Sequence, residues 1–150
     1  MPLGARFIGL LGLVPFLALA FLSVTETSIG GAKADDVVRA YGAIILSFLG
    51  GVQWGLAIRK SGGNSRTRRG LTPTLSLSVA PSLVAWAGLL TDGLFGFGLL
   101  ILGFALVLIS DSRAVRLGMA PQWYLNLRYQ LTAVVIGCLT VILATSEYLT

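Results

Sequence analysis

The stretch TPTLSLSVAPSLVAWAGLLTDGLFGFGLLILGFALVLIS, residues 72–110, decides the fold, because Asp92 is its only charged residue. It divides into two apolar runs, 72–91 and 93–110. Each run is long enough to cross the hydrocarbon core of a bilayer as a helix. Only Thr91-Asp92-Gly93, a turn signal, separates them. We therefore expect two helices that are antiparallel neighbours.

Three more apolar runs flank this pair, at residues 7–23, 37–58 and 127–146. The sequence thus predicts an all-α integral membrane protein, a single domain (residues 1–150) of five transmembrane helices. The first run is also compatible with a secretory signal peptide, since Arg6 precedes an apolar stretch and small residues. Pro15 and Pro81 interrupt two of the runs and predict kinks rather than ends of helices.

The composition agrees with a lipid environment. Hydrophobic residues make up 55% of the chain, charged residues only 11%, and mean hydropathy is +0.86. Soluble domains carry about a quarter charged residues. The net charge is +5, but the basic residues lie in short gaps between apolar runs and lack interleaved aromatic residues. We therefore expect anionic lipid as the partner of these charges, and not nucleic acid.

The distribution of charge predicts an orientation. With five spans, one side of the membrane carries nine basic residues and the other side carries two. The positive-inside rule then places the N-terminus in the cytoplasm and the C-terminus outside. The nine are Arg6, Arg59, Lys60, Arg66, Arg68, Arg69, Arg113, Arg116 and Arg128, and the two are Lys33 and Arg39.

The residues needed for catalysis are scarce. There is no histidine, and Cys138 is the only cysteine. Without histidine, the commonest metal ligand and the usual general base are missing. No acidic or basic residue lies near the centre of any predicted helix, which argues against proton-coupled transport. We expect no catalytic residues, metal or cofactor, and hence not an enzyme.

The run 37–58 carries a small residue at every fourth position. This spacing places the four on one helix face, where small side chains let another backbone approach closely. The face is interpreted as the centre of the bundle, with an oligomer contact as the alternative. Its residues are Ala43, Ser47, Gly51 and Gly55.

A polar side chain, Gln53, lies deep in the same run, beside Trp54. A buried amide must find a hydrogen-bond partner, so Gln53 should face the interior. One interpretation is an interhelical hydrogen bond to Ser76, Ser78 or Ser82. The other is a polar intramembrane site that holds a small ligand or a quinone head group and involves Gln53, Trp54, Ser78 and Ser82.

Two connecting segments carry further signals. The basic loop after residue 58 is a topology determinant and a predicted contact for anionic lipid on the cytoplasmic side. The segment 111–128 reads as an interfacial turn that leads into the last helix, or as a short surface helix, because Pro121 suits a first helical position and Trp123 and Tyr124 suit the head-group layer. The lipid-contacting residues are Arg59, Lys60, Arg66, Arg68 and Arg69.

The segments AYGAIILSFLGGVQWGL (Ala40–Leu56) and APQWYLNLR (Ala120–Arg128) carry a family resemblance. The chain resembles an uncharacterised family of bacterial inner-membrane proteins that includes mitochondrial transmembrane protein 69. The string SFLGG-x-x-WG, from Ser47 to Gly55, is the most specific part. The resemblance implies a multi-pass protein of the bacterial inner membrane and implies no reaction.

Two functions are compatible with these observations. The first is an accessory or scaffold subunit that associates with other membrane subunits of a respiratory or photosynthetic electron-transport complex. The alternative is a small-molecule carrier, or a quinone or lipid binder, that uses the polar site around Gln53 and Trp54.

Overall fold

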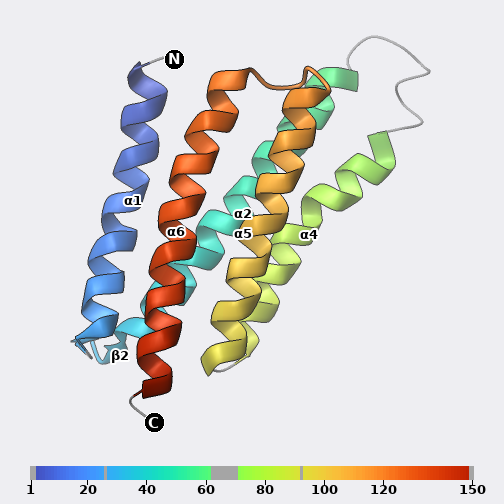
Figure 1. Ribbon diagram of the computed structural model, residues 1–150. Coiled ribbons are helices and arrows are strands. Elements are labelled where there is room, and N and C mark those ends of the chain that lie inside the picture. The colour runs from blue at the N-terminus through green and yellow to red at the C-terminus, as the bar shows by residue number, and fades with distance from the viewer. Residues whose placement is uncertain (1–2, 26, 62–70, 92, 149–150) are drawn as a thin grey trace.

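The computed structural model describes residues 3–25, 27–61, 71–91 and 93–148, which form five long helices and one small hairpin. The helices lie side by side, and the two termini lie at opposite ends of the bundle (Figure 1). The elements are α1 (Leu3–Val24), β1 (Ser28–Ile29), β2 (Ala32–Lys33), α2 (Ala34–Ser61), α4 (Leu71–Leu90), α5 (Gly93–Arg116) and α6 (Gln122–Tyr148).

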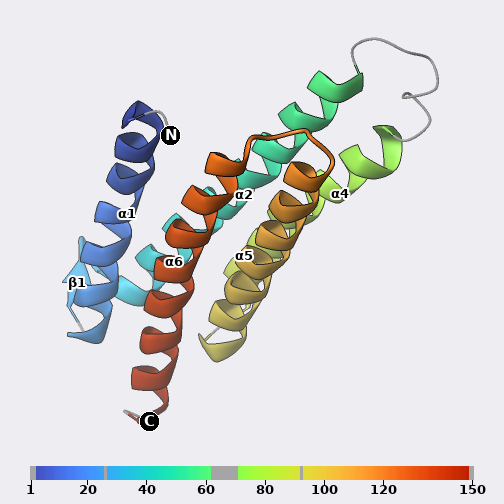
Figure 2. The ribbon, with the colours of Figure 1, turned by 45° about the horizontal axis from the view of Figure 1, so that its top comes forward.

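Helix α2 packs against α1, α4 and α5, while α6 packs against α1 and α5. Figure 2 shows α2 and α4 behind α5 and α6, with α1 at one edge of the bundle. The core between these helices is apolar and consists of side chains from all five. Its largest fully buried members are Phe16, Leu46, Leu100, Phe104 and Leu139.

Four helices, α1, α2, α5 and α6, are long and apolar enough to cross a membrane by length and composition. The apolar part of α4 that is described in full, Leu75–Leu90, is shorter. Many large apolar side chains on the outside of the bundle are exposed, such as Phe7 and Phe95. The all-helical architecture expected from the sequence is therefore present, and large apolar side chains lie on its outer surface.

The connection between α4 and α5 is as tight as the sequence predicts. Gly93 begins α5 with φ of +57°, a conformation that favours glycine. Gly96 then approaches α4 so closely that an added Cβ would lie 2.7 Å from the carbonyl oxygen of Gly88. The prediction that these helices are antiparallel neighbours is confirmed, and the close approach depends on glycine.

The connection between α5 and α6 differs from the expected interfacial turn. Helix α5 continues past Ser110 to Arg116, and α6 begins at Gln122 instead of residue 127. Helix α5 ends in a Schellman motif, in which Met119 N–H donates to Ala114 and Gly118 N–H donates to Val115. Gly118 supplies the required positive φ, +69°. The predicted interfacial turn over residues 111–128 is shorter than expected, because Asp111 and Arg128 pair with each other inside the helices.

Helix α2 approaches α4 through Gly50, and not through the glycines of the predicted packing face. A Cβ on Gly50 would lie 2.6 Å from the carbonyl oxygen of Ser78, whereas Gly51 and Gly55 have nothing within 4 Å. Of the other predicted members, Ala43 is buried and Ser47 is half-buried. Only the Ala43 end of that face therefore points into the bundle, and the glycine end points outward.

We predict that Gly50→Ala destabilises the protein and that Gly51→Ala does not. Both substitutions gain the same helix propensity, so their difference isolates the clash with the Ser78 backbone. Overpacking of this kind costs about 1–3 kcal/mol. Apparent melting temperatures of the two variants in the same detergent would measure the difference. Equal melting temperatures would contradict the close approach at Gly50.

Candidate functional site

The most polar interior site is centred on Asp111, whose side chain is 1% exposed on α5. Its Oδ1 accepts hydrogen bonds from Gln53 Nε2 at 2.6 Å and from the Tyr124 hydroxyl at 2.9 Å. Its Oδ2 accepts one from Arg128 Nε at 2.7 Å. We call Gln53, Asp111, Tyr124 and Arg128 the polar cluster. It joins three helices, α2, α5 and α6.

Asp111 and Arg128 form a buried ion pair, since the Arg128 side chain is only 8% exposed. Taking two charges out of water is costly, and good geometry with additional hydrogen bonds is needed to offset that cost. The two further donors to Asp111 provide this. Arg128 Nη2 and the Thr132 hydroxyl, one turn along α6, are buried and find no partner among the described residues.

The spacing of the residues explains how the cluster forms. Tyr124 and Arg128 lie four residues apart on α6, so both side chains point from the same helix face toward Asp111. The predicted interfacial turn over residues 111–128 placed Asp111 outside the helices, so this relation was missed. The sequence did contain a signal: Asp111 directly follows an apolar run, and Tyr124 and Arg128, four residues apart, precede or begin the next run.

Gln53 is an interhelical hydrogen-bond donor, as one interpretation of the sequence expected, but its partner is Asp111 and not a serine of α4. Ser78 instead donates to the Leu75 carbonyl of its own helix at 2.7 Å. Trp54 is 41% exposed on the outside of α2. The structure therefore does not assemble Gln53, Trp54, Ser78 and Ser82 into one site.

A pocket of about 270 Å³ lies between α2, α4 and α5. We call it the α4–α5 pocket. It brings together Gln53 and Ser78 but neither Trp54 nor Ser82. Most of its wall is apolar, and the remaining polar side chains are Ser110 and Arg113 of α5. A mostly apolar pocket with a few polar groups is the usual form of a small-molecule site.

A second buried charge, Arg39 of α2, lies at the opposite end of the bundle and is 6% exposed. It donates to the carbonyl oxygens of Gly88 at 3.0 Å, Leu89 at 3.3 Å and Thr91. These are terminal carbonyls of α4, which favour a cation. Asp36 and the ring of Phe97 lie beside the guanidinium. Arg39 therefore caps α4 and is not the surface charge that the sequence suggested.

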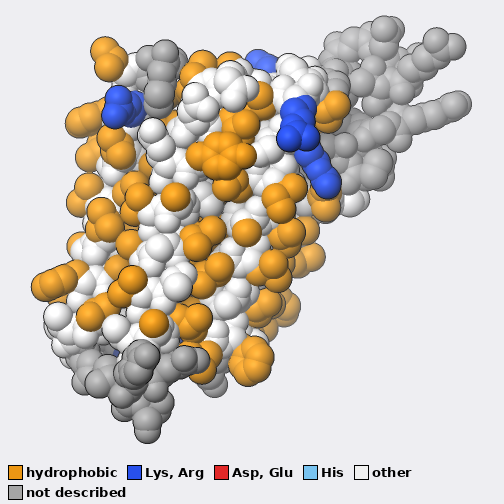
Figure 3. All heavy atoms as spheres, viewed as in Figure 1, with side chains coloured by type: hydrophobic (Ala, Val, Ile, Leu, Met, Phe, Trp, Pro, Cys, Tyr) orange, Lys and Arg blue, Asp and Glu red, His pale blue; other side chains and the backbone are white. Residues whose placement is uncertain are grey.

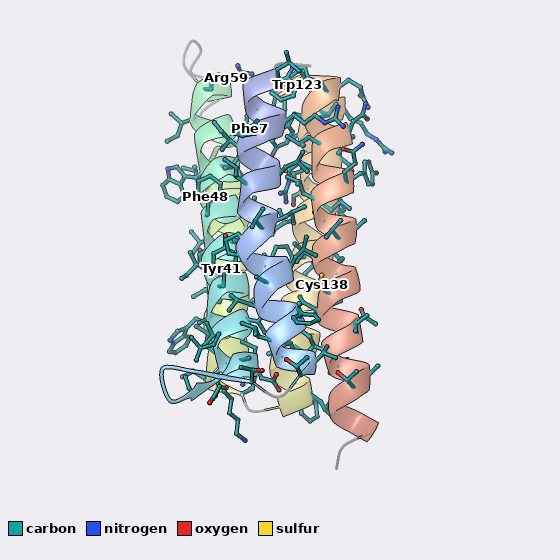
Figure 4. The ribbon with its side chains drawn as sticks, turned by 90° about the vertical axis from the view of Figure 1, so that its left-hand side faces the viewer. Phe7, Tyr41, Phe48, Arg59, Trp123 and Cys138 are labelled. Atoms are coloured by element: carbon teal, nitrogen blue, oxygen red, sulfur yellow. The ribbon has the colours of Figure 1, made fainter. Side chains whose placement is uncertain are left out.

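Four exposed arginines, Arg6, Arg59, Arg113 and Arg116, lie at the end of the bundle that carries the α5–α6 turn. We call it the basic end. On the face shown in Figure 3, the visible Lys and Arg side chains lie there, and Figure 4 places Arg59 and Trp123 at this end. Of the predicted lipid contacts, Arg59 also donates to the Met119 carbonyl. The Lys60 side chain and Arg66, Arg68 and Arg69 lie outside the described residues.

The remaining candidates for chemistry are few. Cys138 of α6 is half-buried against the apolar core. Asp111 is held by three donors. Within the part of the chain that the structure describes, no three His, Cys, Asp or Glu side chains come together as metal ligands. The arrangement is suited to holding helices together and to binding an apolar or amphipathic molecule.

Apolar helices with exposed outer faces, and buried charges paired across them, define a multi-pass helical membrane protein. The chain belongs to the family described as "Protein of unknown function (DUF3429)", which matches residues 1–144. The expected membership of an uncharacterised family is thereby confirmed.

Two named relatives are proteins called Transmembrane protein 69. The one from Xenopus tropicalis is 36% identical over 140 residues, which cover 90% of this chain and 51% of the relative. The one from Mus musculus is 31% identical over 133 residues, which cover 89% and 52%. The chain thus spans about half the length of these relatives. No solved structure matches it.

We predict that the polar cluster behaves as a coupled unit. Asp111→Leu leaves Arg128 buried without a counter-charge, which costs about 3–5 kcal/mol. The double variant Asp111→Leu/Arg128→Met removes both charges and should recover much of that loss. Unfolding of the wild type, both single variants and the double variant in detergent would complete the cycle. Additive effects would show that the pair is not coupled.

We also predict that Arg39→Met destabilises the bundle by about 2 kcal/mol, because the last carbonyls of α4 lose a charged donor. Lys33→Met, at the same end but exposed, is the matched control and should leave the melting temperature unchanged. An Arg39→Met variant as stable as this control would show that capping of α4 by Arg39 contributes nothing.

Proposed function

We propose that this protein is a non-enzymatic accessory or scaffold subunit that binds a helix of another membrane protein through the outer face of α2. The observation that supports it is the shape of this face. Ile44 and Phe48 are 65% and 67% exposed, and Gly51 and Gly55 follow on the same side with nothing within 4 Å. Ile58 continues the face and is half exposed.

Bulky side chains beside two small ones form a notch into which a second helix fits. Lipid chains are as apolar as leucine, so helices associate in membranes through close packing, and glycines four residues apart permit that packing. The glycines that the sequence suggested for the bundle interior are thus available for the alternative that it left open, a contact with another chain.

The proposal also includes the topology. All five long helices, α4 among them, cross the bacterial inner membrane, and the N-terminus lies in the cytoplasm. Support comes from the basic end, where Arg6, Arg59, Arg113 and Arg116 are exposed, while Lys33 is exposed at the other end. Basic residues concentrate on the cytoplasmic side. A respiratory or photosynthetic electron-transport complex is the proposed partner.

Isolation of the tagged full chain from native membranes in mild detergent, followed by mass spectrometry, tests the proposal. We expect a defined membrane partner that is lost in Gly51→Leu/Gly55→Leu. The control is Gly98→Leu, at an exposed glycine of α5 with nothing within 4 Å, which should retain the partner. Recovery of the wild type as a lone monomer, or retention of the partner by the double variant, would refute it.

A second candidate function is the binding of an amphipathic small molecule in the α4–α5 pocket. The observation that favours it is the position of Gln53. Its side-chain Nε2 donates a hydrogen bond to Asp111, and the side chain lines the pocket. Its side-chain Oε1 accepts no hydrogen bond from any described residue. Because the hydrogen bond to Asp111 holds the amide in place, Gln53 Oε1 is an oriented acceptor beside the apolar side chains of the pocket.

A further inference from the structure

We propose that the α4–α5 pocket binds an anionic phospholipid, with an acyl chain along its apolar part and the phosphate on Arg113. The inference rests on the second candidate function, since it specifies the ligand of that pocket. It is supported by the order of polarity along the pocket, by the uncompensated charge of Arg113 and by the contrast with a second groove in the same molecule.

The pocket changes from apolar to polar along its length. On α5, the wall residues include Gly103, Leu106, Ser110 and Arg113, which repeat at helical spacing on one face. Ten residues of helix from Gly103 to Arg113 span about 15 Å, which suits an acyl chain reaching from mid-membrane to the head groups. The charged residue is the one closest to the basic end.

Helix α4 supplies the same order on the opposite wall. Because α4 runs antiparallel to α5, Ser78 lies toward the basic end and Val84 lies farther from it. Pro81, between them, has no N–H, so the Leu77 carbonyl in the wall loses its helical donor. Polar groups therefore gather at the end where a lipid's ester and phosphate groups would lie.

Arg113 is exposed, and no acidic residue forms an ion pair with it within the described part of the chain. The nearby carboxylate, Asp111, is buried and already paired with Arg128. The positive charge at the mouth of the pocket is thus not neutralised by the protein. A guanidinium binds phosphate oxygens through paired, charge-assisted hydrogen bonds.

A groove of about 430 Å³ between α1 and α6 provides an internal comparison. Its wall is apolar, with Phe21, Val24 and Cys138 among its residues, and it contains no charged side chain. Apolar volume alone would make this groove an equal lipid site. Of these two cavities, the α4–α5 pocket is the one that combines an apolar wall with a cation at the end nearest the head groups, which predicts selectivity for an anionic lipid.

The test uses the purified, delipidated full chain and two probes, phosphatidylglycerol and phosphatidylcholine. We expect phosphatidylglycerol to raise the melting temperature more than phosphatidylcholine does, and native mass spectrometry to show tighter binding. Arg113→Gln should weaken phosphatidylglycerol binding about tenfold, the effect of one charge-assisted contact, and should remove the preference. Arg116→Gln, exposed at the same end but outside the pocket wall, is the control and should keep it.

Failure of this inference and failure of the pocket function give different results. Leu106→Trp, which fills the pocket, should abolish binding of phosphatidylglycerol. A preference for phosphatidylglycerol that survives Arg113→Gln, or equal binding of both lipids, would overturn the anionic-lipid site. A quinone that stabilises the wild type but not Leu106→Trp, and is insensitive to Arg113→Gln, would overturn it and retain the pocket function. Lack of effect of Leu106→Trp on every probe would overturn both.

Discussion

An ionised carboxylate buried in a membrane helix needs hydrogen-bond donors, and the basic end of this bundle is organised around that need at Asp111. Its three donors come from two other helices, so α2, α5 and α6 must meet there in one arrangement. The same requirement explains why α5 extends beyond its apolar run and why α6 begins early. The connection between α5 and α6, which contains Gly118, is short because both helices extend far enough to form the Asp111–Arg128 pair.

A complementary constraint operates at the opposite end, where Arg39 supplies donors to carbonyls that α4 cannot satisfy itself. Between the two ends, close side-chain packing holds the helices together. Apolar side chains gain little from leaving lipid for protein, so close contact must come from packing. Among the described glycines, Gly50 of α2 and Gly96 of α5 come closest to the backbone of α4.

Much of the fold could be predicted because it follows from hydropathy and turn chemistry. The helical hairpin at residues 91–93 could be predicted from the local sequence, and the need of Gln53 for a partner follows from that one residue in an apolar run. The identity of that partner is not local: it depends on where α5 ends, which in turn depends on Arg128 across the bundle. The prediction that the small-residue face of α2 points into the bundle was wrong at its glycine end, for a geometric reason. Gly50, which makes the contact, lies outside the small-residue repeat because Leu46 and Trp54 occupy its fourth-position neighbours, and it points about 100° away from Gly51.

The positions of the buried charges also bear on function. Asp111 with Arg128 lies toward one end, and Arg39 lies toward the other. Apart from Thr132, one turn along α6 from Arg128, the largest fully buried side chains between them are apolar and include Phe16, Leu100 and Phe104. The mostly apolar core between the two buried charges is not what a proton or ion path along the bundle would require. The polar groups are placed instead where they fix helices and where Gln53 meets the α4–α5 pocket. A bundle of this kind is suited to hold a partner or a lipid in place.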